Sequence, residues 1–422
     1  MTEVKNGMQV ALQHLESADA VIRKSLIWIK QQCATTKGVS NEKLDGHQMA
    51  SFDLAWCAAE STAARFAVDY AGKVVAAGAA GAGACLEERM ALVFCAEALQ
   101  NIHHRLWARP QSFGLKEADV AALASSSLSY YCQTQLDAGN LEALGRQVIA
   151  LNGASGAYML GDDATMMQDS FRKLATNVVM PLAEEIHRHD RIIPQEILEP
   201  LTEMGCFGLS IPERYGGIQS DDHEDNMGMI VVTEELSRGS LGGAGSLITR
   251  PEILSRSLLK GGTEAQREKW LPKVAVGEPL CAIAVTEPDT GSDVAAMRLK
   301  ATKCDGGWIL DGAKTWCTMA GKAGLILVLA RSNPDRSLGH KGLSMFLVEK
   351  DVYEGHDFEY RQPQGGLLTG RAIATIGYRG MHSYELFFDH VFVPDENLVG
   401  GPGGEGKGFY FIMAGFAGGR IQ

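Results

Sequence analysis

The chain has 422 residues, of which 45% are hydrophobic and 21% charged, a composition typical of a globular protein with roughly two to four domains. A net charge of −12 and a sequence pI near 5.4 argue against nucleic acid and anionic membrane as primary partners, because both require a basic surface. The nine cysteines form no C-x-x-C pair, so we expect neither a zinc ribbon nor a thioredoxin-like site and interpret them as reduced, buried thiols.

Residues 1–155 predict an all-α N-terminal extension. The first ten residues carry neither an apolar export signal nor an Arg-rich organelle signal, and no apolar run of about 18 residues follows, so we expect a cytoplasmic chain without a membrane span. Apolar residues recur at intervals of three and four in three stretches, which predicts amphipathic helices. The positions expected to face the core are Leu15, Ala18, Ile22, Leu26, Ile29, Leu54, Ala55, Ala59, Ala63, Phe66, Tyr70, Leu86, Met90, Val93, Leu99, Ile102 and Leu106.

Residues 160–279 predict a second helical domain, in which Thr263 is a credible N-cap. From 280 to 398, short β-prone runs alternate apolar and polar residues between turn residues, which predicts an antiparallel β domain. Residues 399–422 combine a Gly-rich linker with the beginning of a helix. The linker has the spacing of a phosphate loop, but Gly408 stands where such a loop requires Ser or Thr, so we interpret it as a connector.

The stretch "AVTEPDTGSDVA", residues 284–295, is the strongest candidate for a binding loop. A predicted strand ends at Val285 and Thr286, and the turn that follows exposes backbone N–H groups and hydroxyls, which bind polar heterocycles and phosphates without net charge. About 25 residues later, Trp316 and Thr318 share one face of a predicted strand because side chains alternate with a period of two. An indole wall beside hydroxyl donors suits a flat redox ring, although a buried Trp with a satisfied neighbour is also common.

Other chemistries have weaker support in the sequence. The acids of the 284–295 stretch lack the spacing of a calcium loop, so no metal site is expected there. No G-x-S-x-G elbow occurs, which argues against one class of serine hydrolase. Most of the histidines lie in polar stretches, and His382, beside Arg379 in the β domain, is the one that we single out; a surface strand position is its simplest interpretation.

Several long motifs together resemble the acyl-CoA dehydrogenases. They are "AVTEPDTGSDVAAM", "WILDGAKTWCTMAGKA", "ELFFDHVFVPDENLVG" and "GEGKGF", and the resemblance covers residues 162–422. It implies an α+β fold with a helical domain, an antiparallel β-barrel or sandwich, and the first turns of a C-terminal helical bundle. It also implies FAD, α,β-dehydrogenation of an acyl-CoA substrate, electron-transfer flavoprotein as the electron acceptor, and a homodimer or homotetramer.

The resemblance assigns roles to individual positions. Those expected to contact FAD are Val285, Thr286, Gly291, Ser292, Trp316, Cys317 and Thr318, with Thr318 near flavin N5 and Gly291 and Ser292 beside the pyrophosphate. Ser292 and Arg420 are expected to contact the acyl-CoA.

The catalytic base departs from the family pattern. Most members carry a glutamate base in the C-terminal helical domain, and some place it just before the arginine that corresponds to Arg420, where this sequence has Gly419. We therefore expect the base beyond Gln422, a C-terminally truncated sequence, and weak FAD binding and no activity for this chain alone. The alternative is a natural short homologue that binds flavin or acyl-CoA without turnover.

The N-terminal extension and the segments "SLITRPEILSRSLL" and "TGRAIATIGYRGMHSYEL" resemble family members whose short, branched substrate carries a second carboxylate. A buried carboxylate requires a cation or several donors. Arg250, on the helix expected to close the pocket, is our candidate clamp, and Arg379 and His382 are weaker ones. A surface salt bridge for Arg250, or another short-chain or branched-chain substrate, stays open.

Overall fold

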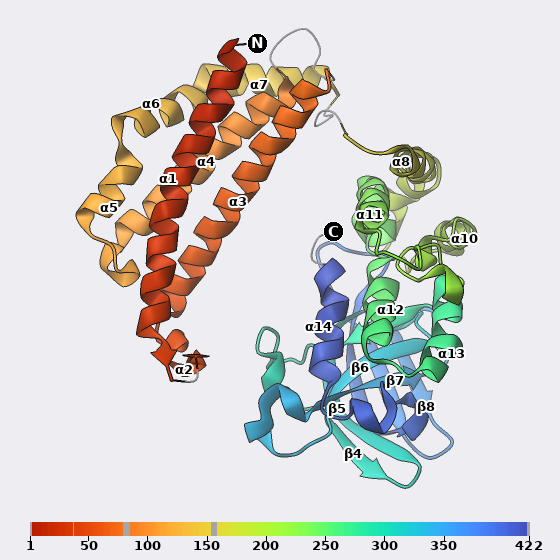
Figure 1. Cartoon of the computed structure of the whole chain (residues 1–422). Coiled ribbons are helices and arrows are strands. Elements are labelled where there is room, and N and C mark those ends of the chain that lie inside the picture. Colours follow the sequence, from red (N-terminus) through yellow and green to blue (C-terminus); the bar gives the residue numbers. More distant parts are fainter. Residues whose placement is uncertain (1, 37, 79–84, 153–157, 420–422) are drawn as a thin grey trace. The chain divides into compact units, whose positions relative to one another are not determined.

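The computed structural model describes residues 2–36, 38–78, 85–152 and 158–419. Its internal contacts divide the chain into two compact units, residues 1–159 and 160–422 (Figure 1). Each unit has hydrophobic clusters of its own, so each is described by itself. Within these described ranges, no helix is both long enough and apolar enough to cross a bilayer.

Unit 1 is helical, as predicted, and its long helices pack against one another. Its elements are α1 (Thr2–Gln32), β1 (Ala34–Thr35), β2 (Gly38–Val39), α2 (Asn41–Asp45), α3 (Gln48–Ala76), α4 (Leu86–Ala108), α5 (Glu117–Ala121), α6 (Ser126–Gln135) and α7 (Ala138–Ala150). Most of the predicted core positions of α1 and α4 are buried, but Leu26 and Met90 are exposed.

The predicted buried face of α3 is wrong over its middle. Ala55, Ala59, Ala63 and Phe66 are exposed and Tyr70 is half-buried. The buried stripe is Ala50, Asp53, Leu54, Cys57, Ser61, Ala64, Val68, Ala71 and Val74. Polar contacts with α1 select this face: Ser61 Oγ donates to Asp19 Oδ1 (2.5 Å), and Arg65 Nη2 pairs with Asp19 Oδ2 (2.6 Å). In an Ala-rich helix the hydrophobic contrast between faces is small, so such contacts decide the orientation.

Unit 2 begins with helices, and a sheet follows. The helices are α8 (Asp162–Leu174), α9 (Met180–Arg188), α10 (Gln195–Glu203), α11 (Asn226–Ser240), α12 (Thr249–Gly261) and α13 (Glu264–Ala275), with α14 (Gly408–Gly419) after the sheet. The predicted N-cap is confirmed: the Thr263 hydroxyl accepts from the Gln266 N–H, and the Gln266 side chain accepts from the Thr263 N–H.

The strands are β3 (Cys281–Ala284), β4 (Lys300–Cys304), β5 (Gly307–Thr318), β6 (Leu325–Arg331), β7 (Leu343–Glu349), β8 (Asp357–Arg361), β9 (Leu367–Ala372) and β10 (Ser383–Pro394). They form one sheet in the order β3-β6-β4-β5-β10-β9-β8, with β7 on β6. The expected α+β class is confirmed. The sheet is not wholly antiparallel, because β3 pairs with β6 in parallel, as does β4 at a single residue pair.

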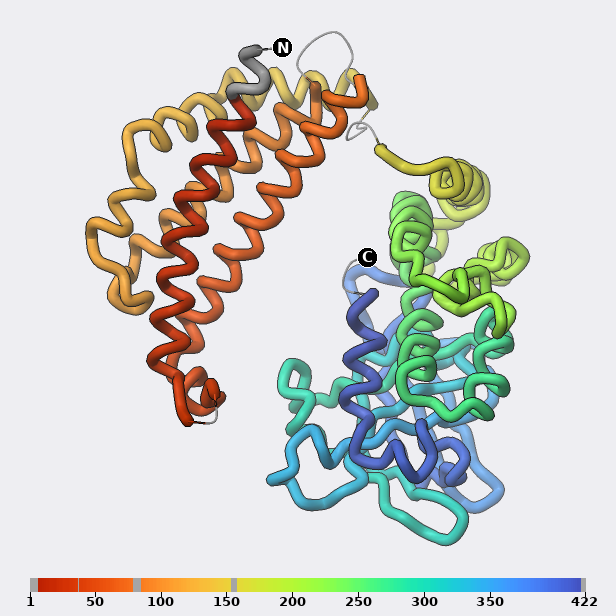
Figure 2. Tube along the Cα trace, viewed as in Figure 1, coloured from red at the N-terminus to blue at the C-terminus, as the bar shows by residue number. Residues whose placement is uncertain are grey.

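Strand β6 is buried on both faces, which anchors the helices to the sheet. Leu325, Leu327 and Leu329 belong to the cluster shared with α12 and α13, whereas Ile326 and Val328 belong to the cluster formed by the other face of the sheet. Figure 2 shows the C-terminal helix α14 running beside α12. The two helices approach closely at glycine, since a Cβ on residue 415 would lie 2.6 Å from the Ile253 carbonyl oxygen.

Candidate active site

A cavity of about 160 Å³ collects most of the predicted site residues in unit 2. Its lining comes from α12, from β3 and the loop after it, from the end of β5, and from α14: Arg250, Ile253, Ile283, Val285, Thr286, Thr315, Trp316, Thr318 and Phe416. The lining therefore contains four hydroxyl or indole side chains, apolar groups and a single cation. Five of the predicted residues meet here although up to 68 positions separate them.

A buried ion pair holds the loop that follows β3. Lys314 Nζ lies 3.0 Å from Glu287 Oε1 and donates to the Val285 carbonyl oxygen at 2.8 Å. The Glu287 carboxylate also accepts from the backbone N–H groups of Arg298 (2.6 Å) and Leu299 (2.8 Å). Burial lowers the pKa of Lys314, and the Glu287 charge opposes that shift. Because both charges are buried, removing one of them costs about 3–5 kcal/mol, so this pair fixes the loop firmly.

Backbone hydrogen bonds then set the loop against β5. The Thr315 N–H donates to the Thr286 carbonyl oxygen (2.9 Å), and Glu287 and Thr290 exchange two N–H···O bonds of 3.0 and 3.1 Å. Gly291 and Ser292 lie beyond this tight turn, exposed, and do not line the cavity. Among the described residues, the buried Thr290 Oγ1 has no hydrogen-bond partner.

A β-bulge presents Trp316 to the cavity. The pairing of β5 with β10 shifts between Tyr384 and Leu386, which face Cys317 and Lys314, so β5 holds an extra residue there. Trp316 takes a φ of 59°, a value uncommon outside glycine, and its side chain is 56% exposed. The sequence predicted that Trp316 and Thr318 face the same side because side chains alternate along a regular strand. The bulge interrupts that alternation, but both residues line the cavity.

Cys317 and Thr318 have different environments. Cys317 is buried in the core of the sheet and does not line the cavity, and burial raises the pKa of its thiol to about 12. Thr318 Oγ1 shares a hydrogen bond of 2.9 Å with Ser383 Oγ. Ser383 is therefore a supporting residue that sequence reasoning missed, because nothing in the order of residues pairs it with Thr318.

Arg250 reaches the cavity from the first turn of α12. Its Nη1 donates to the Ser246 carbonyl oxygen (2.7 Å), and Nη2 donates to the Tyr378 hydroxyl (3.2 Å). Among the described residues no carboxylate pairs with Arg250, so the surface salt bridge considered from the sequence is not formed there. Tyr378 was also missed, since 128 positions separate it from Arg250.

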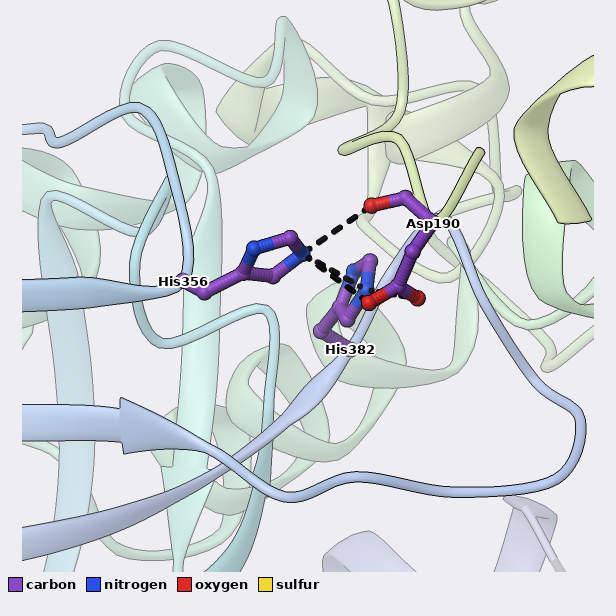
Figure 3. Close-up of side chains that lie close together, drawn as sticks. All are labelled: Asp190, His356 and His382. Carbon is purple, nitrogen blue, oxygen red and sulfur yellow. Dashed lines mark hydrogen bonds and ion pairs between the residues drawn. The ribbon is translucent and has the colours of Figure 1, made fainter. Parts of the chain in front are cut away.

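The remaining predicted residues lie elsewhere. His382 is not a surface strand residue: it is 4% exposed, precedes β10 and contacts Asp190 and His356 (Figure 3). Arg379 pairs with Asp190 (Nε–Oδ1 3.3 Å) and does not line the cavity. Arg420 falls outside the described residues.

Comparisons with known proteins fit this geometry. Models of the N-terminal and middle domains of acyl-CoA dehydrogenase match residues 161–278 and 282–391. A (2S)-methylsuccinyl-CoA dehydrogenase from Cereibacter sphaeroides is 35% identical over 98% of this chain and 74% of its own length. A mitochondrial 2-methylacyl-CoA dehydrogenase from Solanum tuberosum is 33% identical over 62% of this chain and 58% of its own.

Among solved structures, a glutaryl-coenzyme A dehydrogenase in complex with glutaryl-CoA superposes with a TM-score of 0.54 and 29% identity. That alignment covers 63% of this chain and 62% of the solved one. The chain therefore spans less than two thirds of the length of the potato relative and of the solved structure.

Proposed function

Because this chain belongs to the acyl-CoA dehydrogenase family, whose members are oxidoreductases acting on the CH–CH bond of acyl-CoA, we propose that its cavity takes part in the FAD-dependent oxidation of an acyl-CoA between Cα and Cβ. The observation that carries the proposal is the convergence of Thr286, Trp316, Thr318 and Arg250 on one cavity. An exposed indole, several hydroxyls and a single cation from segments far apart in the sequence are not expected to meet at one surface by chance.

The residues present fit FAD. Trp316 offers an exposed aromatic face, and Thr286, Thr315 and Thr318 surround it with hydroxyls, which suits a flat, uncharged ring with polar edges. Bound here, FAD supplies a two-electron acceptor. Gly291 and Ser292, on the exposed part of the loop, are proposed to meet the pyrophosphate, and Thr290 Oγ1 is an unused hydrogen-bonding group beside them. Cys317 contributes only through its backbone, since its thiol lies in the core.

We further propose that the substrate is (2S)-methylsuccinyl-CoA and the product mesaconyl-CoA, a step of the ethylmalonyl-CoA pathway. Two observations support it: Arg250 is the only charged residue among those lining the cavity, and the similarity to the Cereibacter sphaeroides protein extends through unit 1. A guanidinium pairs with a carboxylate through two parallel hydrogen bonds, which suits the distal carboxylate of this substrate. Electron-transfer flavoprotein as acceptor and a homodimeric or homotetrameric assembly are part of the same proposal.

The general base is proposed to lie outside the cavity lining described above. None of the nine lining residues carries a carboxylate. The family pattern predicts a glutamate beyond Gln422 for this role, because Gly419 occupies the alternative position. Arg420, outside the described residues, is proposed to contact the CoA moiety.

A second candidate substrate is a branched acyl-CoA without a second carboxylate. Ile253, Ile283 and Phe416 make part of the lining apolar, and the potato relative is a 2-methylacyl-CoA dehydrogenase. On this alternative, Arg250 would bind the Tyr378 hydroxyl and the Ser246 carbonyl oxygen without contacting the acyl group.

The test is to express the protein from its complete reading frame, reconstitute it with FAD and record its visible spectrum anaerobically. Methylsuccinyl-CoA is expected to bleach the flavin absorbance and form mesaconyl-CoA, whereas isobutyryl-CoA and 2-methylbutyryl-CoA are expected to bleach it slowly. Faster bleaching by the monocarboxylic substrates would select the second candidate. A protein that binds flavin but is bleached by none of them would be a binding module, and one that stays colourless would refute the FAD proposal.

A further inference from the structure

A cluster of three potential metal ligands lies apart from the cavity, where distant parts of unit 2 meet (Figure 3). Asp190 follows α9, His356 precedes β8, and His382 precedes β10. The His382 Nε2 atom lies 3.0 Å from Asp190 Oδ1 and 3.1 Å from His356 Nε2. The third edge, from His356 Nε2 to Asp190 Oδ2, is 3.5 Å. These distances involve both carboxylate oxygens of Asp190, and one ligand atom from each of the three residues lies within 4.8 Å of the other two.

The hydrogen bonds of His382 fix which of its ring nitrogens carries a proton. Its Nδ1 lies 3.1 Å from the Gly380 carbonyl oxygen, which only accepts, so Nδ1 is the donor. In the neutral ring, Nε2 then has a lone pair directed at the Asp190 carboxylate, which also offers only lone pairs. A positive centre is needed between them. A proton on His382 Nε2 serves the Asp190 carboxylate, and a proton on His356 Nε2 serves the Asp190 carbonyl oxygen (3.0 Å), whereas a single metal ion would bind lone pairs of all three side chains together.

The distances match those of a coordination site. Zinc binds His nitrogen at about 2.0–2.1 Å and carboxylate oxygen at about 2.0–2.2 Å, so the ligand–ligand edges of a tetrahedron are about 3.3–3.5 Å. The His382 Nε2 contacts of 3.0 Å to Asp190 Oδ1 and 3.1 Å to His356 Nε2, and the 3.5 Å contact from His356 Nε2 to the other carboxylate oxygen, lie within a few tenths of an ångström of those values. The Nδ1–H of His382 donates to a backbone carbonyl, which is the outer contact that orients metal-binding histidines.

Burial and backbone geometry also favour a built site. His382 is 4% exposed, while His356 and Asp190 are 43% and 48% exposed, which leaves an open side for a water ligand. Both Asp190 (φ 51°) and His382 (φ 47°) take positive φ values, a strained conformation that persists where the surroundings impose it. Arg379 Nε lies 3.3 Å from Asp190 Oδ1, so this guanidinium orients the carboxylate from outside the cluster.

We propose that Asp190, His356 and His382 bind one divalent transition-metal ion of the Zn²⁺ class. The ion clips the segment after α9 to the β domain. Its position also supports the end of β5, because the Met319 N–H donates to the His382 carbonyl oxygen (2.9 Å) and the neighbouring Ser383 hydroxyl pairs with Thr318. Metal binding at these three residues depends on neither the substrate nor FAD.

A second group of possible ligands provides the control. Asp311, Asp389 and His390 also lie close together, but they contain a single histidine, and His390 and Asp389 are 76% and 73% exposed. The cluster has no buried ligand and no outer hydrogen bond from a second ring nitrogen to a backbone carbonyl in the described residues. Exposed acidic clusters of this kind are common without an ion, so it should not hold one tightly.

The test uses the untagged protein, stripped with a chelator and titrated with Zn²⁺ against a chromophoric chelator, and with Co²⁺ while its visible ligand-field bands are recorded. One Zn²⁺ per chain is expected, with Co²⁺ bands of four- or five-coordinate intensity and a melting temperature that rises with Zn²⁺ concentration. His356→Ala and Asp190→Ala should each weaken binding by about tenfold or more, as loss of a ligand requires. His390→Asn should bind as the unaltered protein does, and Arg379→Gln should still bind.

His356 is 43% exposed, so His356→Ala is expected to fold even if His382→Ala does not. If the stripped protein shows no ligand-field bands when it is titrated with Co²⁺, the proposal is overturned. Zn²⁺ binding that survives both His356→Ala and Asp190→Ala, or that His390→Asn removes, would overturn it too. In those cases the cluster is a hydrogen-bonded network held by a proton.

Discussion

Arg250 presents a guanidinium to a cavity whose other lining residues are uncharged. If it binds the distal carboxylate of the substrate, Arg250→Ala should lower kcat/KM for methylsuccinyl-CoA by roughly 10- to 100-fold, since hydrogen bonds to charged groups contribute about 1.5–3 kcal/mol. The same change should alter kcat/KM for isobutyryl-CoA by less than about threefold, because that substrate has no second carboxylate for the guanidinium to bind. Steady-state kinetics of the FAD-loaded protein measures both values.

Lys260→Ala provides the matched control, because Lys260 is an exposed cation on the same helix. It should leave both substrates unaffected. Tyr378→Phe, which removes the hydroxyl that accepts from Arg250 Nη2 but keeps the charge, should give an intermediate loss. Equal losses on both substrates after Arg250→Ala would mean that this residue supports the fold of the cavity and does not recognise a carboxylate.

Lys350, just after β7, gives the protein a pH dependence that can be tested. Burial lowers the pKa of Lys350 to about 7, and its Nζ donates to the carbonyl oxygens of Gly321 and Asp351, both at 2.8 Å. Between pH 7 and about 10.4, the unfolded chain binds a proton that the folded chain does not, so the free energy of unfolding rises with pH. The slope from this group is at most about 1.4 kcal/mol per pH unit.

Lys350→Met should remove that slope. The stability of the variant relative to the parent is expected to increase as pH falls from 10 to 7 and to level off below 7, as measured by urea unfolding. Lys341→Met, at an exposed lysine nearby in the sequence, should show no such trend. A constant difference between Lys350→Met and the parent across this range would show that Lys350 is charged in the folded protein.

At the scale of elements, the bulge in β5 decides what the strand can present. Trp316 sits at φ 59°, where a residue with a Cβ is disfavoured by about 1–2 kcal/mol relative to glycine. We therefore expect Trp316→Gly to be more stable than Trp316→Ala by about 1 kcal/mol in urea unfolding, the reverse of the usual order in a strand. Both variants should bind FAD more weakly, as measured by fluorescence titration.

The control in the same strand compares Trp308→Gly with Trp308→Ala, because the backbone at Trp308 does not have a positive φ. There the alanine variant should be the more stable one. If alanine were also preferred at position 316, the strained conformation would not be a property of the folded protein in solution.

The sequence predicts the positions of helices and strands better than it predicts which face of each element is buried. The β-prone segments of residues 280–398 and the N-cap at Thr263 were predicted from neighbouring residues alone, and the structure confirms both. The face of α3 depends on Asp19 of another helix, and the orientation of Trp316 depends on an extra residue relative to β10. Neither partner can be identified from the local sequence, so strict periodicity gave the wrong face for Phe66.

At the scale of the whole molecule, unit 1 has the features of an independent domain. Its hydrophobic cluster runs from Ala11 to Tyr131 and includes Leu99 at 2% exposure. We expect a polypeptide of residues 1–159 to be helical by circular dichroism and to unfold cooperatively in urea. Leu99→Ala should destabilise it by about 2–5 kcal/mol through loss of buried contacts.

Ile149→Ala, at a residue that is 76% exposed, should change the stability of that polypeptide by no more than about 0.5 kcal/mol. A gradual, non-cooperative loss of helical signal for residues 1–159 would contradict the prediction. It would mean that the cluster from Ala11 to Tyr131 is insufficient without the rest of the chain.

Contacts between residues far apart in the sequence also explain which parts of the candidate site could be predicted. The loop of 284–295 and the segment 316–318 were recognisable because each carries its functional groups in a short run of sequence. Tyr378, Ser383 and the Asp190–His356–His382 cluster were not, because their partners lie up to 192 positions away. The identity of these side chains is ordinary, and only the fold gives them a shared location.

The six residues from Tyr378 to Ser383, the loop before β10 and the first residue of that strand, make contacts with two sites. Tyr378 contacts Arg250 and Ser383 contacts Thr318 at the cavity, while Arg379 and His382 both contact Asp190. Inserting or deleting even one amino acid here would displace all four at once. In the part of the chain that the structure describes, the hairpin connection between β8 and β9 is tied elsewhere chiefly by the two hydrogen bonds between Gln362 and Phe392, so it should tolerate such length changes better. Gene-library screens that vary loop length should therefore recover functional clones from the hairpin connection and almost none from 378–383.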